Sequence, residues 1–98
     1  MAVDRMVFWS AEAKDQVDTT KEYIRQLWSE HEVEAFLDLL HEFEILVKQF
    51  PNGYQASDLY SGCRRAVIHP NISVVYKVSS KEIEVVTVYD NRSSRSQR

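Results

Sequence analysis

Basic and phenolic side chains gather near the C-terminal end of the sequence, where Arg64 and Arg65 open one apolar segment and Tyr89 and Arg92 close another. A guanidinium group can hold a phosphate through paired hydrogen bonds, and a phenol can take part in proton transfer. Each side chain also has a structural interpretation, as an edge charge, a ring at the rim of a sheet or a basic cap of a strand. The residue types therefore leave phosphate chemistry and a structural role open.

Other kinds of catalytic or ligand-binding site lack the residues they need. The three histidines, His31, His41 and His69, lie on different predicted elements, and no CxxC or HxxxH pattern accompanies the single cysteine, Cys63. The sequence has no glycine-rich phosphate loop and no readable Ser-His-Asp arrangement. We therefore expect no metal site, no cofactor and no internal disulfide bond.

The elements that would position these side chains are three short runs rich in valine, isoleucine and tyrosine between Gly62 and Arg92. Turn-forming residues at 69–71 and 79–81 separate the runs, so the segment is predicted to be a three-stranded meander. In the second run, Tyr76 falls on an apolar face and is predicted to be a core residue. In the third run, strict alternation would place the odd-numbered residues on one face, namely Ile83, Val85, Thr87 and Tyr89.

The N-terminal half is predicted to supply one strand and two helices. Residues 3–9 form a short apolar run, and a helix is predicted over residues 11–28 with Ser10 as its N-cap. A second helix begins after the capping box at 29–32 and ends before the Pro-Asn-Gly sequence at 51–53. The predicted fold class is α+β with the order β-α-α-β-β-β, in which a helical hairpin packs on a mainly antiparallel four-stranded sheet.

The apolar stripe of the second helix is wider than one face needs. Residues at spacings of three and four trace a stripe from Val33 onward, and Leu39, Ile45 and Leu46 widen it. Either this helix lies deeper in the protein than the first, or another chain covers its extra flank. A partner helix in a groove beside Leu39 and Leu46 fits the second alternative, with Arg64 as a further candidate for partner binding.

Charge is distributed unevenly along the chain. The formal net charge is −3, and six acidic residues lie between Glu30 and Glu44, with a seventh, Glu22, on the preceding helix. From Arg92 onward there are three arginines and no acidic residue. This balance argues against a generally basic nucleic-acid-binding protein, and it gives the second helix a surface that suits a basic partner segment.

The remaining bulk properties are those of an ordinary globular protein, with 44% apolar and 28% charged residues. The sequence has no leader peptide and no apolar run of membrane-spanning length, so we expect a cytoplasmic protein without membrane contacts. Residues 1–92 are predicted to form a single domain. Residues 93–98 are predicted to be a disordered polar and basic tail.

The order and spacing of these elements resemble the RelE/ParE superfamily of type II toxin–antitoxin toxins, which includes plasmid stabilisation proteins. The resemblance covers nearly the whole chain and is most specific in residues 63–67, 74–78 and 83–92, the last of which end in Asp-Asn-Arg. That closing sequence resembles a ParE-like branch. The resemblance implies a growth-inhibiting toxin that a cognate antitoxin neutralises.

The resemblance also implies two alternative targets. RelE-like members cut mRNA on the ribosome, whereas ParE-like members act on DNA gyrase. Metal-free RNA cleavage needs acid and base groups and cations around the phosphate, and Arg65 matches one basic position of the RelE-like enzymes. Ser73 and Val67 stand where those enzymes often have further basic residues, so the catalytic set is incomplete.

We therefore expect a toxin whose target-facing surface carries three candidate catalytic residues, Arg65, Tyr89 and Arg92. The incomplete catalytic set and the acidic balance favour a ParE-like inhibition of DNA gyrase. One alternative is a RelE-like, ribosome-dependent mRNA endoribonuclease. The other is a non-toxic, toxin-derived interaction module that would bind a partner through the groove beside the second helix.

Overall fold

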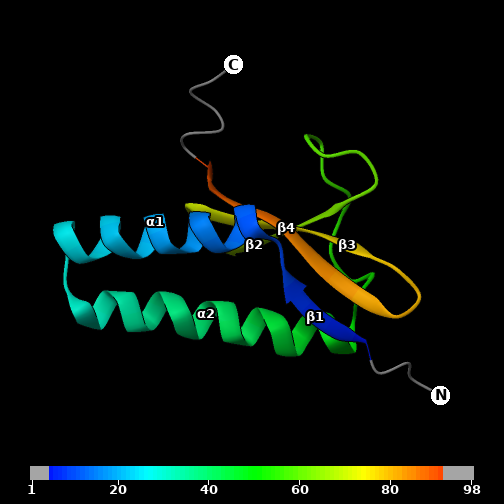
Figure 1. Cartoon of the computed structure of the whole chain (residues 1–98), viewed down its shortest axis with the longest axis horizontal. Helices are drawn as coiled ribbons and strands as arrows, with labels where there is room; N and C mark the ends of the chain where they lie inside the picture. Colours follow the sequence, from blue (N-terminus) through cyan, green and yellow to red (C-terminus); the bar gives the residue numbers. More distant parts are fainter. Residues whose placement is uncertain (1–4, 92–98) are drawn as a thin grey trace.

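Two helices cover one face of a four-stranded sheet in the computed structural model, which describes residues 5–91 (Figure 1). The elements, in chain order, are β1 (Met6–Trp9), α1 (Ala11–Leu27), α2 (Glu30–Gln49), β2 (Arg64–His69), β3 (Ile72–Val78) and β4 (Glu82–Asp90). The predicted order and the α+β fold class, with a helical hairpin packed on the sheet, are both confirmed.

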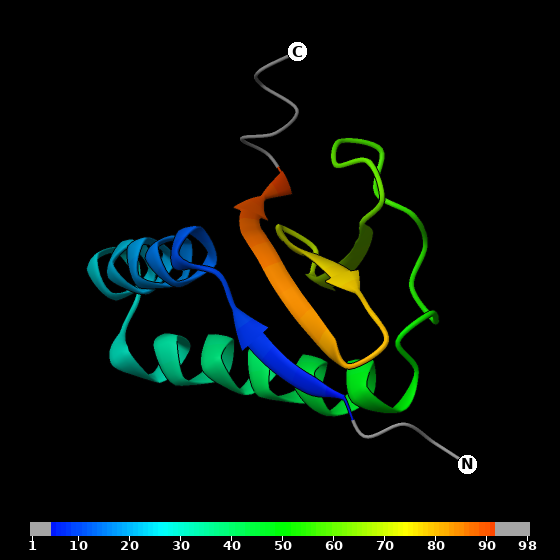
Figure 2. The same cartoon turned by 45° about the vertical axis from the view of Figure 1, so that its right-hand side comes forward.

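The sheet has the strand order β1-β4-β3-β2, so β1 and β2 form its edges. The pairs β2–β3 and β3–β4 are antiparallel, as expected for a meander. β1 is parallel to β4, with Val7 opposite Ile83. The sheet is therefore mainly antiparallel, as predicted, and this one parallel pair makes it mixed. Figure 2 shows the helical hairpin lying along one face of this sheet.

Serine residues begin both helices. Ser10 Oγ and Ser29 Oγ each accept a hydrogen bond from the amide three residues further on, at 3.0 and 3.4 Å, so both predicted N-caps are confirmed. α1 ends at Leu27, one residue before its predicted end. β1 begins at Met6, and its predicted start, Val3, lies outside the described residues.

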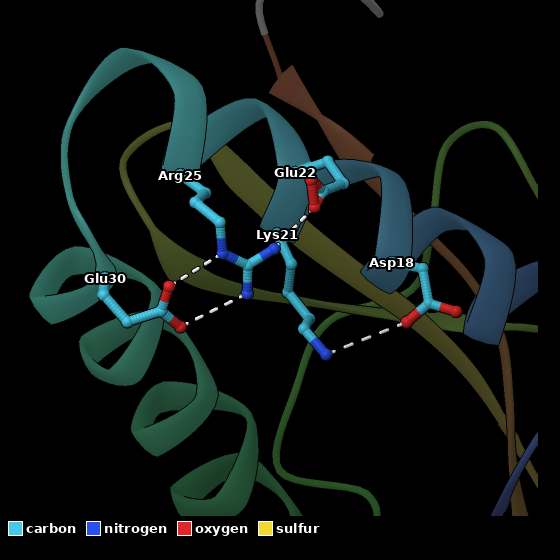
Figure 3. Close-up of polar contacts among 5 residues, drawn as sticks. All are labelled: Asp18, Lys21, Glu22, Arg25 and Glu30. Atoms are coloured by element: carbon cyan, nitrogen blue, oxygen red, sulfur yellow. Dashed lines mark hydrogen bonds and ion pairs between the residues drawn. The ribbon is translucent and has the colours of Figure 1, made fainter.

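An arginine joins the end of α1 to the start of α2. Arg25 Nε and Nη2 donate to the two carboxylate oxygens of Glu30 at 2.7 and 3.2 Å, and Nη1 donates to Glu22 (Figure 3). The hydrogen bond to Glu30 raises the pKa of Arg25, and Arg25 lowers the pKa of Glu30. Exposed ion pairs add little stability. The paired contact with Glu30 nevertheless fixes the geometry of the short connection between the helices.

The core lies between the helices and one side of the sheet. No helix within residues 5–91 is both long and apolar enough to cross a membrane. Leu37 on α2 and Phe50 at its C-cap are exposed, so the buried stripe is narrower than the sequence pattern indicates. The buried residues that make up the core cluster are Ala13, Phe36, Leu40, Phe43, Val47, Ala66, Ile72, Val74, Tyr76, Ile83, Val85 and Val88.

Tyr76 is the centre of an aromatic cluster beneath the end of α2. Its ring centroid lies 5.7 Å from that of Phe43 and 6.0 Å from that of Tyr54, and the side chain is fully buried. Burial raises the pKa of Tyr76 to about 12, so the phenol is neutral and donates to the Pro51 carbonyl at 2.7 Å. The predicted core role of Tyr76 is confirmed, and its hydroxyl fixes the segment that follows α2.

A β-bulge interrupts the pairing of β3 with β4. Val75 lies opposite Thr87, but the next residue of β3, Tyr76, lies opposite Val85. Val86 is therefore an extra residue in β4. A bulge of this kind inverts the alternation of side chains along the strand that carries it.

The bulge changes which side chains of β4 share a face. Ile83 and Val85 project into the core, and after the bulge Val88 does so as well. Thr87 and Tyr89 consequently project to the opposite face. The prediction that Ile83, Val85, Thr87 and Tyr89 share one face is wrong, because it assumed unbroken alternation through Val86.

We expect Tyr76→Ala to lower the free energy of unfolding by about 3 kcal/mol or more, as truncations of large core side chains do. Tyr76→Phe keeps the ring and loses the bond to Pro51, so it should cost about 1 kcal/mol. Urea denaturation of both variants measures the difference. A Tyr76→Ala variant as stable as the unaltered chain would show that this ring is not part of the core.

Ser10 also bonds to the bulge, because its hydroxyl donates to the Val86 carbonyl at 2.7 Å. We expect Ser10→Ala to lower the free energy of unfolding by about 2 kcal/mol, from the lost cap and the lost bond together. Ser29→Ala removes a cap alone and should cost about 1 kcal/mol or less. Equal losses in denaturation experiments would contradict a contribution from the bond to Val86.

Candidate functional site

The face of the sheet that points away from the helices holds the predicted target-facing residues. We call it the outer face, and its members alternate with core residues along each strand. They are Met6 and Phe8 on β1, Arg65 and Val67 on β2, Ser73, Val75 and Lys77 on β3, and Glu82, Glu84, Thr87 and Tyr89 on β4.

Arg65 belongs to a hydrogen-bonded network on the outer face. Its Nε donates to Ser73 Oγ at 2.9 Å, its Nη2 donates to Asn91 Oδ1 at 3.2 Å, and the Ser73 hydroxyl donates to the same Asn91 oxygen. Asn91 is held in turn, since its Nδ2 donates to the Pro70 carbonyl and its backbone N–H to the Asn71 carbonyl. None of the ion pairs within residues 5–91 involves Arg65. Neutral acceptors therefore orient the guanidinium group.

Two residues that orient Arg65 were not predicted from the sequence. Ser73 stood out only as a position where related enzymes often have an arginine, and Asn91 only as part of the closing Asp-Asn-Arg. Ser73 is fully buried on β3, and Asn91 follows the end of β4. Their contact with Arg65 depends on the register of three strands. The available signal was a serine among the aliphatic residues that begin β3.

Tyr89 lies on the outer face together with Arg65. It is half-buried and directly opposite Ser73, the residue that accepts from Arg65 Nε. The bulge at Val86 places it there. Two of the three predicted catalytic residues are thus on one surface, with Ser73 between their strands. The third, Arg92, lies outside the described residues.

Arg64 projects to the side of the sheet that faces the helices. Its Nη1 donates to the Tyr54 carbonyl at 2.6 Å, and the residue lies opposite Tyr76 in β3. Consecutive residues of a strand point to opposite faces, so Arg64 and Arg65 do not form one basic patch. The contact with Tyr54 gives Arg64 a structural role beside the end of α2, and its contact with a partner stays a prediction.

Positive and negative side chains are equal in number on the outer face, among the residues that the structure describes. Arg65 and Lys77 are the cations, and Glu82 and Glu84 are the carboxylates, with Lys77 directly opposite Glu84. A surface that binds a nucleic-acid backbone needs several uncompensated cations. Residues 5–91 also contain no group of three or more potential metal ligands. The outer face thus presents a single oriented cation, not a basic patch.

The extra apolar flank of α2 is not covered by the described part of the chain. Leu39 is half-buried, whereas Ile45 and Leu46 are 47% and 45% exposed. Leu46 lines a shallow hollow of about 240 Å³ with Phe50 and Tyr54. α2 does lie deeper than α1, with five buried residues against one, but Ile45 and Leu46 are left exposed, so coverage of this flank by another chain stays open.

Acidic residues lie beside this flank on the exposed side of α2. Glu34, Asp38 and Glu42 recur every four residues, and none of the ion pairs in residues 5–91 involves them. Glu22 and Glu30 are paired with the arginine at the helix junction (Figure 3). The uncompensated acidic surface is therefore narrower than the sequence indicates, and it borders the apolar flank.

One family model matches most of the chain. Residues 7–94 match the family described as the ParE toxin of the type II toxin–antitoxin system parDE. A comparison with curated proteins found no match.

Solved structures of several toxins share this fold. The structure of the chromosomal ParDE system from P. aeruginosa has a TM-score of 0.78 and 17% identity, and the match covers 89% of this chain and 96% of that chain. The E. coli DinJ–YafQ toxin–antitoxin complex matches with a TM-score of 0.63 and 13% identity, over 93% and 97% of the two chains. The YoeB/ParE toxin from Agrobacterium tumefaciens matches with a TM-score of 0.61 and 15% identity, over 87% and 97%. At these identities the likeness shows the fold alone.

Proposed function

The chain belongs to the ParE toxin family of type II toxin–antitoxin systems, and we propose that it inhibits DNA gyrase and is neutralised by a cognate antitoxin bound along α2. The observation that carries the choice of gyrase is the charge balance of the outer face around Arg65. A protein target can be recognised through one well-placed cation, whereas binding of an RNA backbone depends on several.

RNA cleavage is poorly supported by the groups on the outer face. It requires a base for the 2′-hydroxyl, an acid for the leaving oxygen and cations for the transition state. Tyr89 offers one group for proton transfer and Arg65 one cation. Ser73, where RelE-like enzymes often have an arginine, is buried and bonded to Asn91. These features favour gyrase over mRNA as the target.

The partner proposal rests on the exposed side of α2. An amphipathic antitoxin helix could bury its apolar residues against Leu39 and Leu46 and place basic residues near Glu34, Asp38 and Glu42. Arg64 lies close to the same end of α2 through its bond to Tyr54, so it is a third candidate contact. The DinJ–YafQ structure is a toxin–antitoxin complex, which supports a partner of the same kind here.

We expect the purified chain to inhibit DNA supercoiling by gyrase, and Arg65→Ala to weaken that inhibition about tenfold or more, the usual effect of losing a charged contact. Lys77→Ala is the matched control, because Lys77 lies opposite Glu84 and its loss should change inhibition little. Supercoiling assays over a range of toxin concentrations measure both effects.

Three results would contradict this proposal. They are unchanged supercoiling, harmless overexpression in a bacterial host, and site-specific cuts in translated mRNA that disappear in Arg65→Ala. The second result would favour a non-toxic interaction module. The third, measured by primer extension, would favour a ribosome-dependent endoribonuclease.

We expect Leu46→Gln to weaken binding of the antitoxin, the product of a short neighbouring reading frame, by about tenfold, because it removes apolar area from the interface. Leu37→Gln is the matched control. Leu37 is also exposed, but it lies nine residues from Leu46 and therefore on the opposite side of α2. Titration calorimetry compares the two variants, and equal affinities would exclude the flank as the binding site.

A further inference from the structure

We propose that Arg65 is a preorganised site for a single carboxylate of a protein partner, and that Ser73 and Asn91 are its positioning residues. The proposal rests on the proposed function, in that a protein contacts the outer face. The proposal names a carboxylate as the chemical group that the outer face recognises, and it names the residues that set the geometry of the Arg65 side chain.

The hydrogen bonds of Arg65 fix its guanidinium plane without neutralising it. A guanidinium group has five N–H donors, and the bonds to Ser73 and Asn91 use two of them. Both acceptors are uncharged. The Asn91 side chain is itself held by the Pro70 carbonyl at 3.0 Å. A cation fixed in this way loses less conformational entropy on binding than a free arginine side chain does.

Carboxylates of the chain itself do not reach Arg65 in the described structure. Glu82 and Glu84 lie on β4, two strands from β2, which is about 10 Å at the usual strand spacing. Asp90 lies opposite Ile72, a core residue, and so belongs to the helix-facing side. At about 10 Å, physiological salt screens most of the attraction between Arg65 and the two glutamates, and none of the ion pairs within residues 5–91 involves Arg65. The charge of Arg65 is therefore available to an external anion.

The surroundings of Arg65 favour a protein carboxylate over a nucleic-acid phosphate. A planar guanidinium binds either group through two parallel hydrogen bonds. A nucleic-acid strand, however, presents phosphates in series and depends on several cations for affinity. Lys77, the other outer-face cation, lies opposite Glu84. Arg65 is therefore the outer-face cation that is both held by neutral acceptors and distant from the two glutamates of β4.

The neighbours of Arg65 also have the composition of a protein-binding hot spot. Val67 is the next residue on the same face of β2, and it is 52% exposed. The half-buried Tyr89 lies two strands away from Val67, in the same cross-strand row, with Ser73 between them. Arginine and tyrosine dominate the binding energy of many protein interfaces, in which apolar neighbours exclude water from the charged contact. A partner residue that combines a carboxylate with an adjacent apolar side chain fits this arrangement.

A nuclear magnetic resonance titration tests the proposal on the full chain. The probes are the peptide acetyl-Gly-Glu-Gly-amide, its glutamine counterpart and a short single-stranded RNA, all at matched ionic strength. The resonance to follow is the side-chain Nε–Hε of Arg65. We expect it to shift in a saturable way with the glutamate peptide and to stay in place with the glutamine peptide.

Substitutions at Asn91 distinguish a binding site from a structural arginine. In Asn91→Asp the new carboxylate pairs with Arg65 inside the chain, so the response to the glutamate peptide should disappear. The loss of the Nδ2 bond to Pro70 should lower the melting temperature, and circular dichroism must show that the variant is folded at the temperature of the titration. Asn52→Asp makes the same chemical change at an exposed position after α2 and should respond like the unaltered chain. Ser73→Ala removes one of the two hydrogen bonds that hold the guanidinium group and should weaken the response several-fold.

Three outcomes would overturn the carboxylate site. They are the absence of a shift with the glutamate peptide, equal shifts with both peptides, and a shift with RNA at lower concentration than with the glutamate peptide. The titration involves no gyrase, so it is independent of the proposed target. A chain that binds the glutamate peptide without inhibiting gyrase refutes only the target, and a chain that inhibits gyrase without the shift refutes only the carboxylate site.

Discussion

The hydroxyl of Ser10 connects the first helix to the bulge in the last strand, and the outer face depends on that connection. Ser10 Oγ accepts from the Ala13 amide and donates to the Val86 carbonyl, while the Ser10 amide donates to the Val85 carbonyl at 2.9 Å. A bulge takes backbone groups out of the strand ladder, and buried backbone groups need partners. One residue thus caps α1 and donates to two carbonyl groups at the bulge.

The bulge decides which residues of β4 serve the core and which serve the outer face. It returns Val88 to the core and sends Tyr89 to the side that carries Arg65. It also sets where β4 ends, so that Asn91 reaches the Arg65 guanidinium and the Pro70 carbonyl. The arginine comes from β2, whereas the tyrosine and the asparagine come from the end of β4 and the residue that follows it, and one irregularity in the ladder brings them to a common surface. The site is therefore a consequence of strand register.

The fold was predictable from the sequence because its signals are local. Serine caps, helical spacing and turn residues fix α1, α2 and the meander, and the aliphatic alternation around Tyr76 fixes the core side of β3. The outer-face network was not predictable, because a bulge has no local signal in the run Val85-Val86-Thr87. Unbroken alternation placed Tyr89 with Ile83, and only the register shows that Ser73 supports Arg65.

Cross-strand nuclear Overhauser effects test most directly whether the bulge at Val86 sets the outer face. We expect cross-peaks that pair Val75 with Thr87 and Tyr76 with Val85, together with contacts from the Tyr89 ring to Ser73. A regular ladder would instead pair Tyr76 with Val86 while keeping Val75 with Thr87. That pattern, or contacts from the Tyr89 ring to the core residues of α2, would contradict a shared surface for Arg65 and Tyr89.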